Sequence, residues 1–524
     1  MRKGKVWALL GAVILLGLTG CSKTEPVESE NTQVSLDWYV NYSWFATPWG
    51  GNVVSDTITE ETGVSVNFIT PIGNETEKLN ALIASDTLPD LITLGYWEPQ
   101  VDEMIDKGMV YALNELADKY EPYFWEVTDK AAISWYTKPD GNIYAYPNSS
   151  ISLQDLEENS YIGSNQTFLV RKDIYEAIGS PDMSTTEGFM AAVEKAAKMF
   201  PKVDGKPLIP VGSHTFDNEG NVSFDKYLMN FLSIPWEKNG ELYDRYTDEE
   251  YIKWLKMFRQ LNEKGLLATD IFVDTRTQME EKLAEGRYFC MLYQYTDMLS
   301  QQKQLYETNP DMVYMAVEGP RNANGDAPTL PCTSISGWTV TMISKNCENP
   351  DKAIEFISYL LSEQGQLRTY LGVEGKTYDM VESKPVLKQE VKELLDKDRE
   401  AYDKQYGADN AYWMLQDIVM QQQWSQEASP AEEQLREWSR KYVVYNGQYE
   451  VYLPLGNEAA SADSRIRKLW SETLPNLLRA ESEEAFDAVL ADFVEKREEI
   501  GFRLYMKAGT EYMNEAKKKL GLSE

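Results

Sequence analysis

Histidine is almost absent from this sequence. His214 is the single histidine among 524 residues, so neither a Ser-His-Asp triad nor a zinc site built from several imidazoles can form. The chain also contains no GxSxG, P-loop or GxGxxG motif, and these are common signals of hydrolases and nucleotide-binding enzymes. His214 stands in the Gly/Ser-flanked stretch VGSHTF, and we expect it to be a packing or surface residue.

A pair of carboxylates is the catalytic arrangement that remains open. Glycoside hydrolases need only two Asp or Glu side chains at a fixed separation, and the chain has 84 acidic residues. Because a pair can always be found among so many, the acidic content does not indicate an active site. We therefore predict that the protein is not an enzyme, with a surface glycoside hydrolase as the alternative from another class.

Basic residues are scarce relative to acidic ones. The chain has 51 Lys and Arg against 84 Asp and Glu, a formal net charge of −33. The first twenty residues hold Arg2, Lys3 and Lys5 and no acid, so 48 bases would face 84 acids without them, a charge of −36. Such a chain would repel nucleic-acid phosphates and anionic lipid surfaces. We expect no nucleic acid as a partner and no docking onto lipid by charge.

Cysteine is also rare, with four residues in the chain. The spacing of Cys290, Cys332 and Cys347 matches no zinc or redox motif. Cys332 and Cys347 could pair, but one cysteine would then be left over, so we expect free buried thiols. The sequence therefore predicts neither a cofactor nor a bound metal from its cysteines.

A single long apolar run stands near the N-terminus, at residues 6–18. It is too short to span a bilayer, which needs ~20 apolar residues, so it predicts a signal peptide at residues 1–20. The Leu-Thr-Gly-Cys that ends it resembles the bacterial lipoprotein box, in which the cysteine is acylated by lipid. We expect lipidation of Cys21, a flexible tether at residues 21–33, and a place on the extracellular face of the cell membrane. An ordinary signal peptide with an incidental cysteine is the alternative.

Strand and helix patterns alternate along the rest of the chain. Apolar runs predict strands at residues 34–40, 64–69, 91–94, 166–170, 288–293 and 338–343. Helical spacing predicts helices at residues 53–62, 189–199, 248–264, 350–362 and 493–520. Such alternation with short connections favours an α/β fold with doubly wound parallel sheets.

One stretch, residues 79–97, shows how this pattern places functional side chains. It reads as a helix end, a turn before Pro89, a buried strand and Gly95, followed by Tyr96 and Trp97. Ligands of open α/β sheets bind at the carboxyl ends of the strands. We therefore expect Tyr96 and Trp97 to contact a ligand.

Aromatic side chains at other strand exits extend this hypothesis. Aromatic residues make up 12% of the chain, including 14 Trp and 32 Tyr. A sugar ring has an apolar face of C–H groups that packs on Trp or Tyr, while its hydroxyls need hydrogen-bond partners. The predicted ligand-binding residues are Trp44, Tyr96, Trp97, Trp236, Tyr293, Tyr295, Trp338 and Trp413. Gln294 and Glu374 are further candidates for polar contacts, and core packing is the alternative for each aromatic residue.

Several phrases occur in an order that resembles a known family. They are ALIASDTLPDLITLG, LVRKDIYEAIGSPDMSTTEGF, LNEKGLLATDIF, SGWTVTMISKNCENPDKAIEFISYLLSEQG and GVEGKTYDM. Together they resemble the extracellular solute-binding lipoproteins of bacterial ABC importers, in the family-1 branch with LipO-like and oligosaccharide-binding members. Residues 84–90 and 372–378 carry the more specific matches, and the resemblance runs from about residue 34 to the C-terminus.

The resemblance implies a two-lobed, periplasmic-binding-protein-like fold of type II, with a hinge and C-terminal helices. Lobe 1 would comprise residues 34–147 and 333–378, and lobe 2 residues 148–332 and 379–524. Hinge strands would fall near residues 144–150, 330–336 and 372–377. On this analogy Trp236 and Trp413 would come from lobe 2, and closure about the hinge would enclose the ligand between the lobes.

The sequence departs from this family at one point. Many long members carry an acidic Ca²⁺ loop, and the equivalent stretch here is FPKVDGKPLIP at residues 200–210. Asp204 stands alone where a Ca²⁺ site would require 6–8 oxygen ligands, and Lys202 and Lys206 would repel the ion. We therefore expect no calcium here.

The predicted function follows from these observations together. We expect a monomeric, lipid-anchored receptor that binds a carbohydrate, in particular an oligosaccharide, and delivers it to the permease subunits of an ABC transporter. The alternative within the same scaffold is a receptor for a peptide or another solute.

Overall fold

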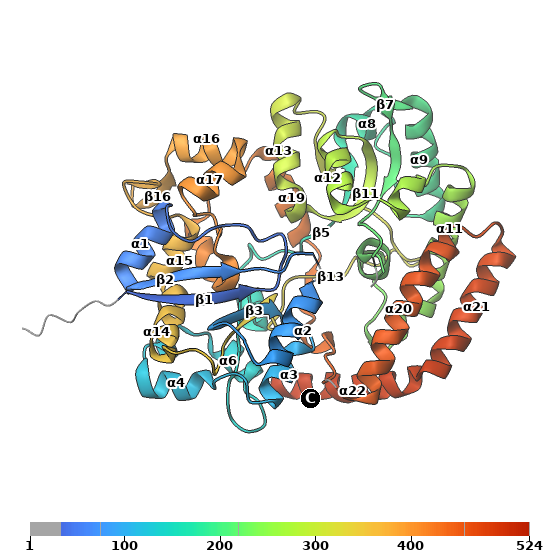
Figure 1. Cartoon of the computed structure of the whole chain (residues 1–524). Helices are drawn as coiled ribbons and strands as arrows, with labels where there is room; N and C mark the ends of the chain where they lie inside the picture. The colour runs from blue at the N-terminus through green and yellow to red at the C-terminus, as the bar shows by residue number, and fades with distance from the viewer. Residues whose placement is uncertain (1–32, 74, 218–219, 455, 523–524) are drawn as a thin grey trace, which may run out of the picture.

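Two larger sheets organise the molecule, which we describe from a computed structural model. The structure describes residues 33–73, 75–217, 220–454 and 456–522. The first sheet has the strand order β2-β1-β3-β14-β4, and the second has the order β12-β5-β11-β8. Figure 1 shows the first sheet in the left lobe and the second in the right lobe. The predicted signal peptide and Cys21 lie outside the described residues.

The first sheet is parallel through three strands and then reverses. β1 (Val34–Val40) pairs in parallel with β2 (Val64–Ile69) and with β3 (Leu91–Gly95). β14 (Thr339–Ile343) runs antiparallel to both β3 and β4 (Tyr146–Pro147). The start of β14 therefore lies at the same edge as the carboxyl ends of β1 and β3.

Side chains on β1 alternate between the two faces of this sheet. Leu36 and Trp38 belong to a core that includes residues of α14 (Pro350–Leu361), whereas Tyr39 belongs to a core with α2 (Glu75–Ser85). The other helices of this lobe are α1 (Val53–Thr62), α3 (Gln100–Asp106), α4 (Leu113–Tyr120), α5 (Phe124–Val127), α6 (Lys130–Tyr136), α15 (Glu363–Tyr370), α16 (Gln389–Lys397) and α17 (Arg399–Gln405). Helices thus cover both faces of the first sheet (Figure 1).

The stretch from residue 79 to residue 97 forms the elements that its sequence predicts. α2 ends at Ser85, and Asp86 takes a left-handed φ of 53° that turns the chain. Every residue of β3 is buried. The strand therefore delivers Tyr96 and Trp97 at its carboxyl end.

The second sheet is mixed, whereas the sequence predicted a parallel sheet. β5 (Gln166–Arg171) runs antiparallel to β11 (Tyr288–Gln294) and to β12 (Tyr314–Ala316). β11 is parallel to β8 (Ile209–Gly212). The start of β5 and the carboxyl ends of β8 and β11 consequently share one edge.

Helices of the second lobe surround this sheet in one core, to which the C-terminal helices contribute. They are α8 (Lys172–Ala177), α9 (Thr186–Met199), α10 (Met229–Phe231), α11 (Glu249–Glu263), α12 (Arg276–Ala284), α13 (Leu299–Thr308), α19 (Pro430–Arg440), α20 (Glu458–Leu478), α21 (Glu483–Ile500) and α22 (Phe502–Lys519). The helix expected at residues 493–520 is in fact broken, because Gly501 has a φ of 118° that ends α21 and begins α22.

The sequence predicted that the chain passes from the first lobe to the second at residue 378, but it does so further along the chain. Val391, Tyr402 and Tyr406 pack in the same core as α14, which places them with the first lobe and not with the second. Residues 372–377 are therefore followed by more of the first lobe and do not cross to the second. The reason is that α16 and α17 bury their apolar sides against this core, which their local sequence pattern does not reveal.

Three segments connect or lie between the lobes. Residues 148–165 and 331–338 link the two sheets, and residues 416–429 lead to α19. In addition, β17 (Val443–Val444) pairs in parallel with β13 (Leu330–Pro331). This last pairing was not expected from the sequence.

The described residues also bear on the cysteines and on membrane insertion. Cys290, Cys332 and Cys347 are free and buried, as predicted. Across the described ranges, no helix combines the length and apolar character needed to traverse a bilayer.

Candidate functional site

Four aromatic residues gather at the edge of the first sheet where β1 ends and β14 begins. Tyr42 and Trp44 follow β1, Trp338 precedes β14, and Trp413 comes from a short 3₁₀ turn. We call Tyr42, Trp44, Trp338 and Trp413 the tryptophan cluster. This edge is the one at which open α/β sheets bind ligands.

The rings of the tryptophan cluster lie in mutual contact. The rings of Trp44 and Trp338 are nearly parallel, at 8°, with centroids 6.2 Å apart. The centroids of Trp338 and Trp413 are 4.6 Å apart, and those of Trp44 and Trp413 are 5.6 Å apart. Trp44 is 57% exposed, whereas Trp413 is only 8% exposed. The cluster is thus anchored in the core on one side and open to solvent at Trp44.

Tyr42 was missed by the sequence reasoning, although it stands two residues after a predicted strand. Its ring lies 5.3 Å from that of Trp338 and 5.4 Å from that of Trp44. The hydroxyl of Tyr42 and the Nε1 of Trp413 are buried and have no hydrogen-bond partner among the described residues. Burial, with the nearby carboxylates of Glu98 and Glu75, raises the pKa of Tyr42 well above its usual value. Applying the strand-exit rule to every aromatic residue would have found it.

The sequence predicted that Trp413 would come from the second lobe. This prediction is wrong, because Trp413 belongs to the first lobe. It packs with Phe45 and Trp338 in the core of the first lobe. Its carbonyl oxygen accepts a hydrogen bond from Asn148 Nδ2 at 3.1 Å. Asn148 also accepts from the Thr339 N–H at 2.9 Å, so one buried amide joins this turn to the start of β14.

Tyr96 and Trp97 form a separate pair at the end of β3. Their rings meet edge to face with centroids 5.2 Å apart. Trp97 is 44% exposed, and its ring lies so close over Gly95 that a Cβ there would be 2.8 Å from it. Tyr96 is half-buried, and its backbone N–H donates to the Trp338 carbonyl at 3.4 Å. Within the described residues no ring contact joins this pair to the tryptophan cluster.

Trp236 lies in the second lobe and stacks on a residue of the segment between the lobes. Its ring and that of Tyr449 are parallel within 9°, with centroids 5.4 Å apart. The guanidinium of Arg245 lies 4.9 Å from the Trp236 ring centroid, and Arg245 Nη2 donates to Asn230 Oδ1 at 2.8 Å. The half-buried Trp236 is thus held between an aromatic ring and a cation.

Tyr293 and Tyr295 lie near the end of β11 and differ in burial. Tyr293 is fully buried, and its ring centroid lies 4.4 Å from that of His214. Burial lowers the pKa of His214 to about 3, which keeps the imidazole neutral. Tyr295 is half-buried, and burial raises the pKa of its hydroxyl. Tyr293 is therefore placed to support the sheet edge in this conformation.

Amide side chains line the edge of the second sheet. Gln294 Oε1 accepts from the hydroxyl of Tyr227 at 2.7 Å and from Asn165 Nδ2 at 3.4 Å. Gln166, which faces Gln294 in the register, accepts from Asn230 Nδ2 at 3.0 Å. Amides and phenols both donate and accept hydrogen bonds, so this edge suits hydroxyl groups. Glu374, the other predicted polar contact, is exposed in the turn before β15 (Tyr378–Val381).

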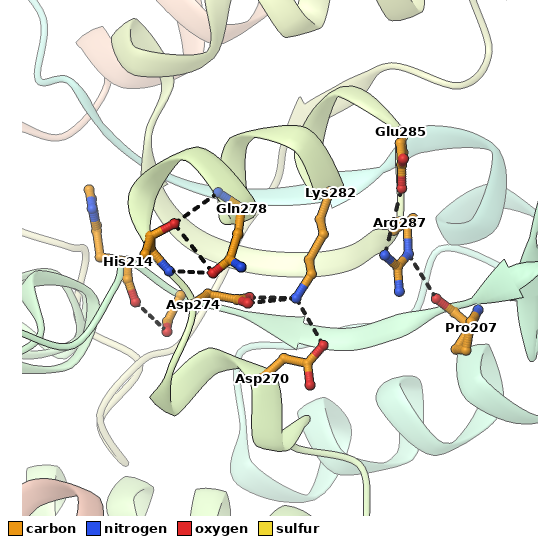
Figure 2. A network of polar contacts seen from close by, with 10 residues as sticks. Pro207, His214, Asp270, Asp274, Gln278, Lys282, Glu285 and Arg287 are labelled. Atoms are coloured by element: carbon orange, nitrogen blue, oxygen red, sulfur yellow. Dashed lines mark hydrogen bonds and ion pairs between the residues drawn. The ribbon is translucent and has the colours of Figure 1, made fainter.

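In the second lobe, the carboxylates of Asp270 and Asp274 both bind the ammonium group of Lys282. Lys282 Nζ donates to Asp274 at 2.7 Å and to Asp270 at 2.9 Å, which ties α12 to the preceding turn (Figure 2). Although burial lowers the pKa of Lys282, these two carboxylates raise it above its usual value overall. Figure 2 shows the His214 imidazole pointing away from this network. Over the described ranges, no cluster of three or more His, Cys, Asp or Glu side chains is arranged to hold a metal.

Sequence comparisons connect the chain with transport proteins. Residues 54–377 match the family model of bacterial extracellular solute-binding proteins. The chain is 26% identical over 231 residues to the fructooligosaccharide ABC transporter substrate-binding protein FusA of Streptococcus pneumoniae, which is 42% of each chain. It is 21% identical over 418 residues to the lipoprotein LipO of Bacillus subtilis, covering 72% of this chain and 74% of LipO. The alignment with FusA therefore spans less than half the length of that relative.

Solved structures show the same fold over nearly the whole chain. FusA in complex with kestose aligns with a TM-score of 0.72 at 16% identity, covering 92% of this chain and 99% of that one. The alginate-binding protein AlgQ2 without calcium ion aligns with a TM-score of 0.69 at 17% identity, covering 92% and 98%. These alignments confirm the predicted two-lobed α/β architecture.

Proposed function

The chain belongs to the family of bacterial extracellular solute-binding proteins, as its sequence phrases predicted, and on that premise we propose that it captures an oligosaccharide for an ABC transporter. The tryptophan cluster is the observation that carries this proposal. Its exposed member, Trp44, presents a flat apolar face beside the parallel ring of Trp338. Such a face suits the C–H side of a pyranose or furanose ring.

The second lobe supplies polar groups that can bind the hydroxyl groups of a sugar. Gln294 and Gln166 stand at the edge of its sheet, and Trp236 adds an aromatic ring beside the segment between the lobes. Hydroxyl groups of a sugar both donate and accept hydrogen bonds, which amides can match. Tyr96, Trp97, Tyr293, Tyr295, Trp338 and Trp413 remain the predicted contacts from the sequence.

Capture without chemistry is the expected action of this site. The matching family and the relatives are binding proteins of transporters. Closure of the two lobes around the ligand would exclude water and create a surface for the permease, through a population shift toward the closed form. The bound sugar would then be released to the permease unchanged.

Lipid at Cys21 would hold this receptor at the membrane. Cys21 lies outside the described residues, so the sequence pattern and the similarity to a lipoprotein support this part of the proposal. An acyl chain on this residue would keep the receptor on the extracellular face, within reach of the permease subunits. Mass spectrometry of the membrane-extracted protein would detect the added lipid.

A thermal-shift screen tests the ligand class. We expect neutral fructo-, manno- or cello-oligosaccharides of three to five units to raise the melting temperature, because a ligand that binds only the folded state stabilises it. Peptides of two to five residues are screened in the same way, as the alternative class of ligand. Analysis of the oligosaccharides after incubation with the protein detects any hydrolysis. Stabilisation by peptides alone, or appearance of shorter sugars, would reject the proposed function.

A further inference from the structure

The segment from Val443 to Tyr452 lies where the two lobes meet. It begins with β17, which pairs with β13 in the connection between the sheets. Further along, the Glu450 carboxylate accepts hydrogen bonds from Ser334 and Ser336 of that connection. It also accepts one from the hydroxyl of Tyr96, at the end of β3. The same segment therefore contacts the connection and the ligand edge of the first lobe.

This segment contacts the second lobe as well. Tyr449 stacks on Trp236 with centroids 5.4 Å apart, and Lys517 of α22 lies 6.0 Å from the Tyr449 ring centroid. Two residues that the sequence predicted to touch ligand, Tyr96 and Trp236, are thus both in contact with residues 449–450. No local pattern in YNGQYEVY indicated this position.

Acceptor oxygens along the segment are buried without donors. Asn446 Oδ1 and Gln448 Oε1 are both buried and have no hydrogen-bond partner within the described part of the chain. No described lysine or arginine forms an ion pair with Glu450, although the charge of Lys226 acts on it from nearby. A buried acceptor without a donor costs free energy, and native structures rarely leave several close together. The presence of two such groups only two residues apart, close to the Glu450 carboxylate, points to a missing donor.

We propose that Asn446, Gln448 and Glu450 form an acceptor row between the lobes that binds ligand hydroxyls and selects neutral over acidic oligosaccharides. This inference rests on the proposed function. A sugar hydroxyl supplies the donor that the side-chain oxygens of Asn446 and Gln448 lack. A uronate carboxylate brings acceptors and a negative charge instead, and ionised Glu450, which has no ion-pair partner among the described residues, repels it. Tyr449, which stands between Gln448 and Glu450 in the chain, stacks on the ring of Trp236.

Calorimetric titration of the lipid-free chain tests this selection directly. The probes are a neutral fructo- or cello-oligosaccharide series and an oligogalacturonate series of the same lengths. We expect the neutral series to bind at least about tenfold more tightly. Glu450→Gln keeps an acceptor for Ser334 but removes the negative charge. The ratio of the affinity for the neutral series to the affinity for the oligogalacturonate series should therefore fall towards one. Equal affinity for both series in the original chain overturns the charge selection.

Truncation of the two amides tests the acceptor row. Asn446→Ala and Gln448→Ala should each weaken neutral-sugar binding by about tenfold. Gln304→Ala on α13 is the matched control, because Gln304 is exposed and its side chain makes no hydrogen bond among the described residues. The control should bind sugar as the original chain does.

The melting temperature without ligand separates a binding role from a structural one. Removing an unsatisfied buried acceptor relieves a cost, so Asn446→Ala and Gln448→Ala should melt at the original temperature or above it. A lower melting temperature with unchanged affinity assigns both amides to structure and overturns the acceptor row. Failure of every sugar to bind the original chain rejects the proposed function, whereas normal binding by both variants rejects the acceptor row alone.

Discussion

At the scale of single residues, the tryptophan cluster combines two different physical roles. Trp413 is 8% exposed and packs against Phe45 and Trp338, so its ring holds the cluster in the core. Trp44 is 57% exposed and contacts the other rings from the solvent side. The same residue type therefore serves stability at one position and is available for a ligand at the other.

Substitution of the two tryptophans should separate these roles. Trp44→Ala should cost about 1–2 kcal/mol of sugar-binding free energy, or roughly 5- to 30-fold in affinity, with little change in stability. Trp413→Ala should lower the free energy of unfolding by about 3–5 kcal/mol, because it leaves a large cavity. Calorimetry and denaturant unfolding measure the two effects. The control is Trp125→Ala, an exposed tryptophan of α5 outside the cluster; an equal loss of affinity there would contradict the assignment.

At the scale of elements, the long helix α20 docks on the second lobe through a buried polar contact. Trp470 is 1% exposed, and its Nε1 donates to Asp225 Oδ1 at 2.6 Å. Burial raises the pKa of Asp225 to about 7, although the Asn221 N–H and Trp470 oppose this shift. The folded chain therefore retains this proton longer than the unfolded chain does. Its stabilising effect is complete below about pH 4 and is lost as the pH rises through 7.

The indole donor should matter most when Asp225 is charged. In Trp470→Phe, the carboxylate loses a hydrogen bond that is stronger to the ionised form, worth about 1.5–3 kcal/mol. We expect the loss of unfolding free energy to be larger at pH 8.5 than at pH 5. Denaturant titrations of both chains at the two pH values give the difference. Equal losses at both values would show that the hydrogen bond does not depend on the charge of Asp225.

At the scale of the whole molecule, polar contacts bridge the lobes away from the connections. Lys519, at the end of α22, donates to the carbonyl oxygens of Trp135 and Thr137 in the first lobe. Lys303 of α13 forms an ion pair with Asp396 of α16. Figure 1 shows α22 at the bottom of the molecule and α13, α16 and α17 at the top, so the two contacts lie on opposite sides of the junction. Both contacts oppose separation of the lobes.

Removal of these two lysines should open the unliganded molecule. We expect Lys303→Ala/Lys519→Ala to have a larger radius of gyration by small-angle scattering, since the lobes lose both lateral contacts. Each contact is partly exposed and worth about 0–1 kcal/mol, so sugar affinity should fall by less than about tenfold. Lys496→Ala, whose ion pair with Asp492 lies within α21, is the control. An unchanged radius of gyration would show that the connections alone set the lobe arrangement.

Local pattern accounts for much of the fold and for part of the site. Apolar runs predicted β1 and β3, and the strand-exit rule placed Trp44 and Trp338 at one edge. The antiparallel course of β5 was not predicted, because an apolar run does not record which neighbour it pairs with or in which direction. Tyr42 was overlooked even though the same rule applies to it. The direction in which β5 pairs depends on strands distant in the chain, and a short window of sequence does not contain this information.

The sequence by itself determined the absence of imidazole chemistry, the excess of acidic groups, the signal-like N-terminus and the family, since each depends on residue types or short ordered phrases. Only the tertiary structure decided that Trp413 joins Trp338 and Tyr42, that residues 387–415 pack with the first lobe, and that residues 443–452 lie between the lobes. The physical reason is that hydrophobic periodicity reports which face of an element is buried. The partner that buries this face, often hundreds of residues away, is chosen by the packing of the complete molecule.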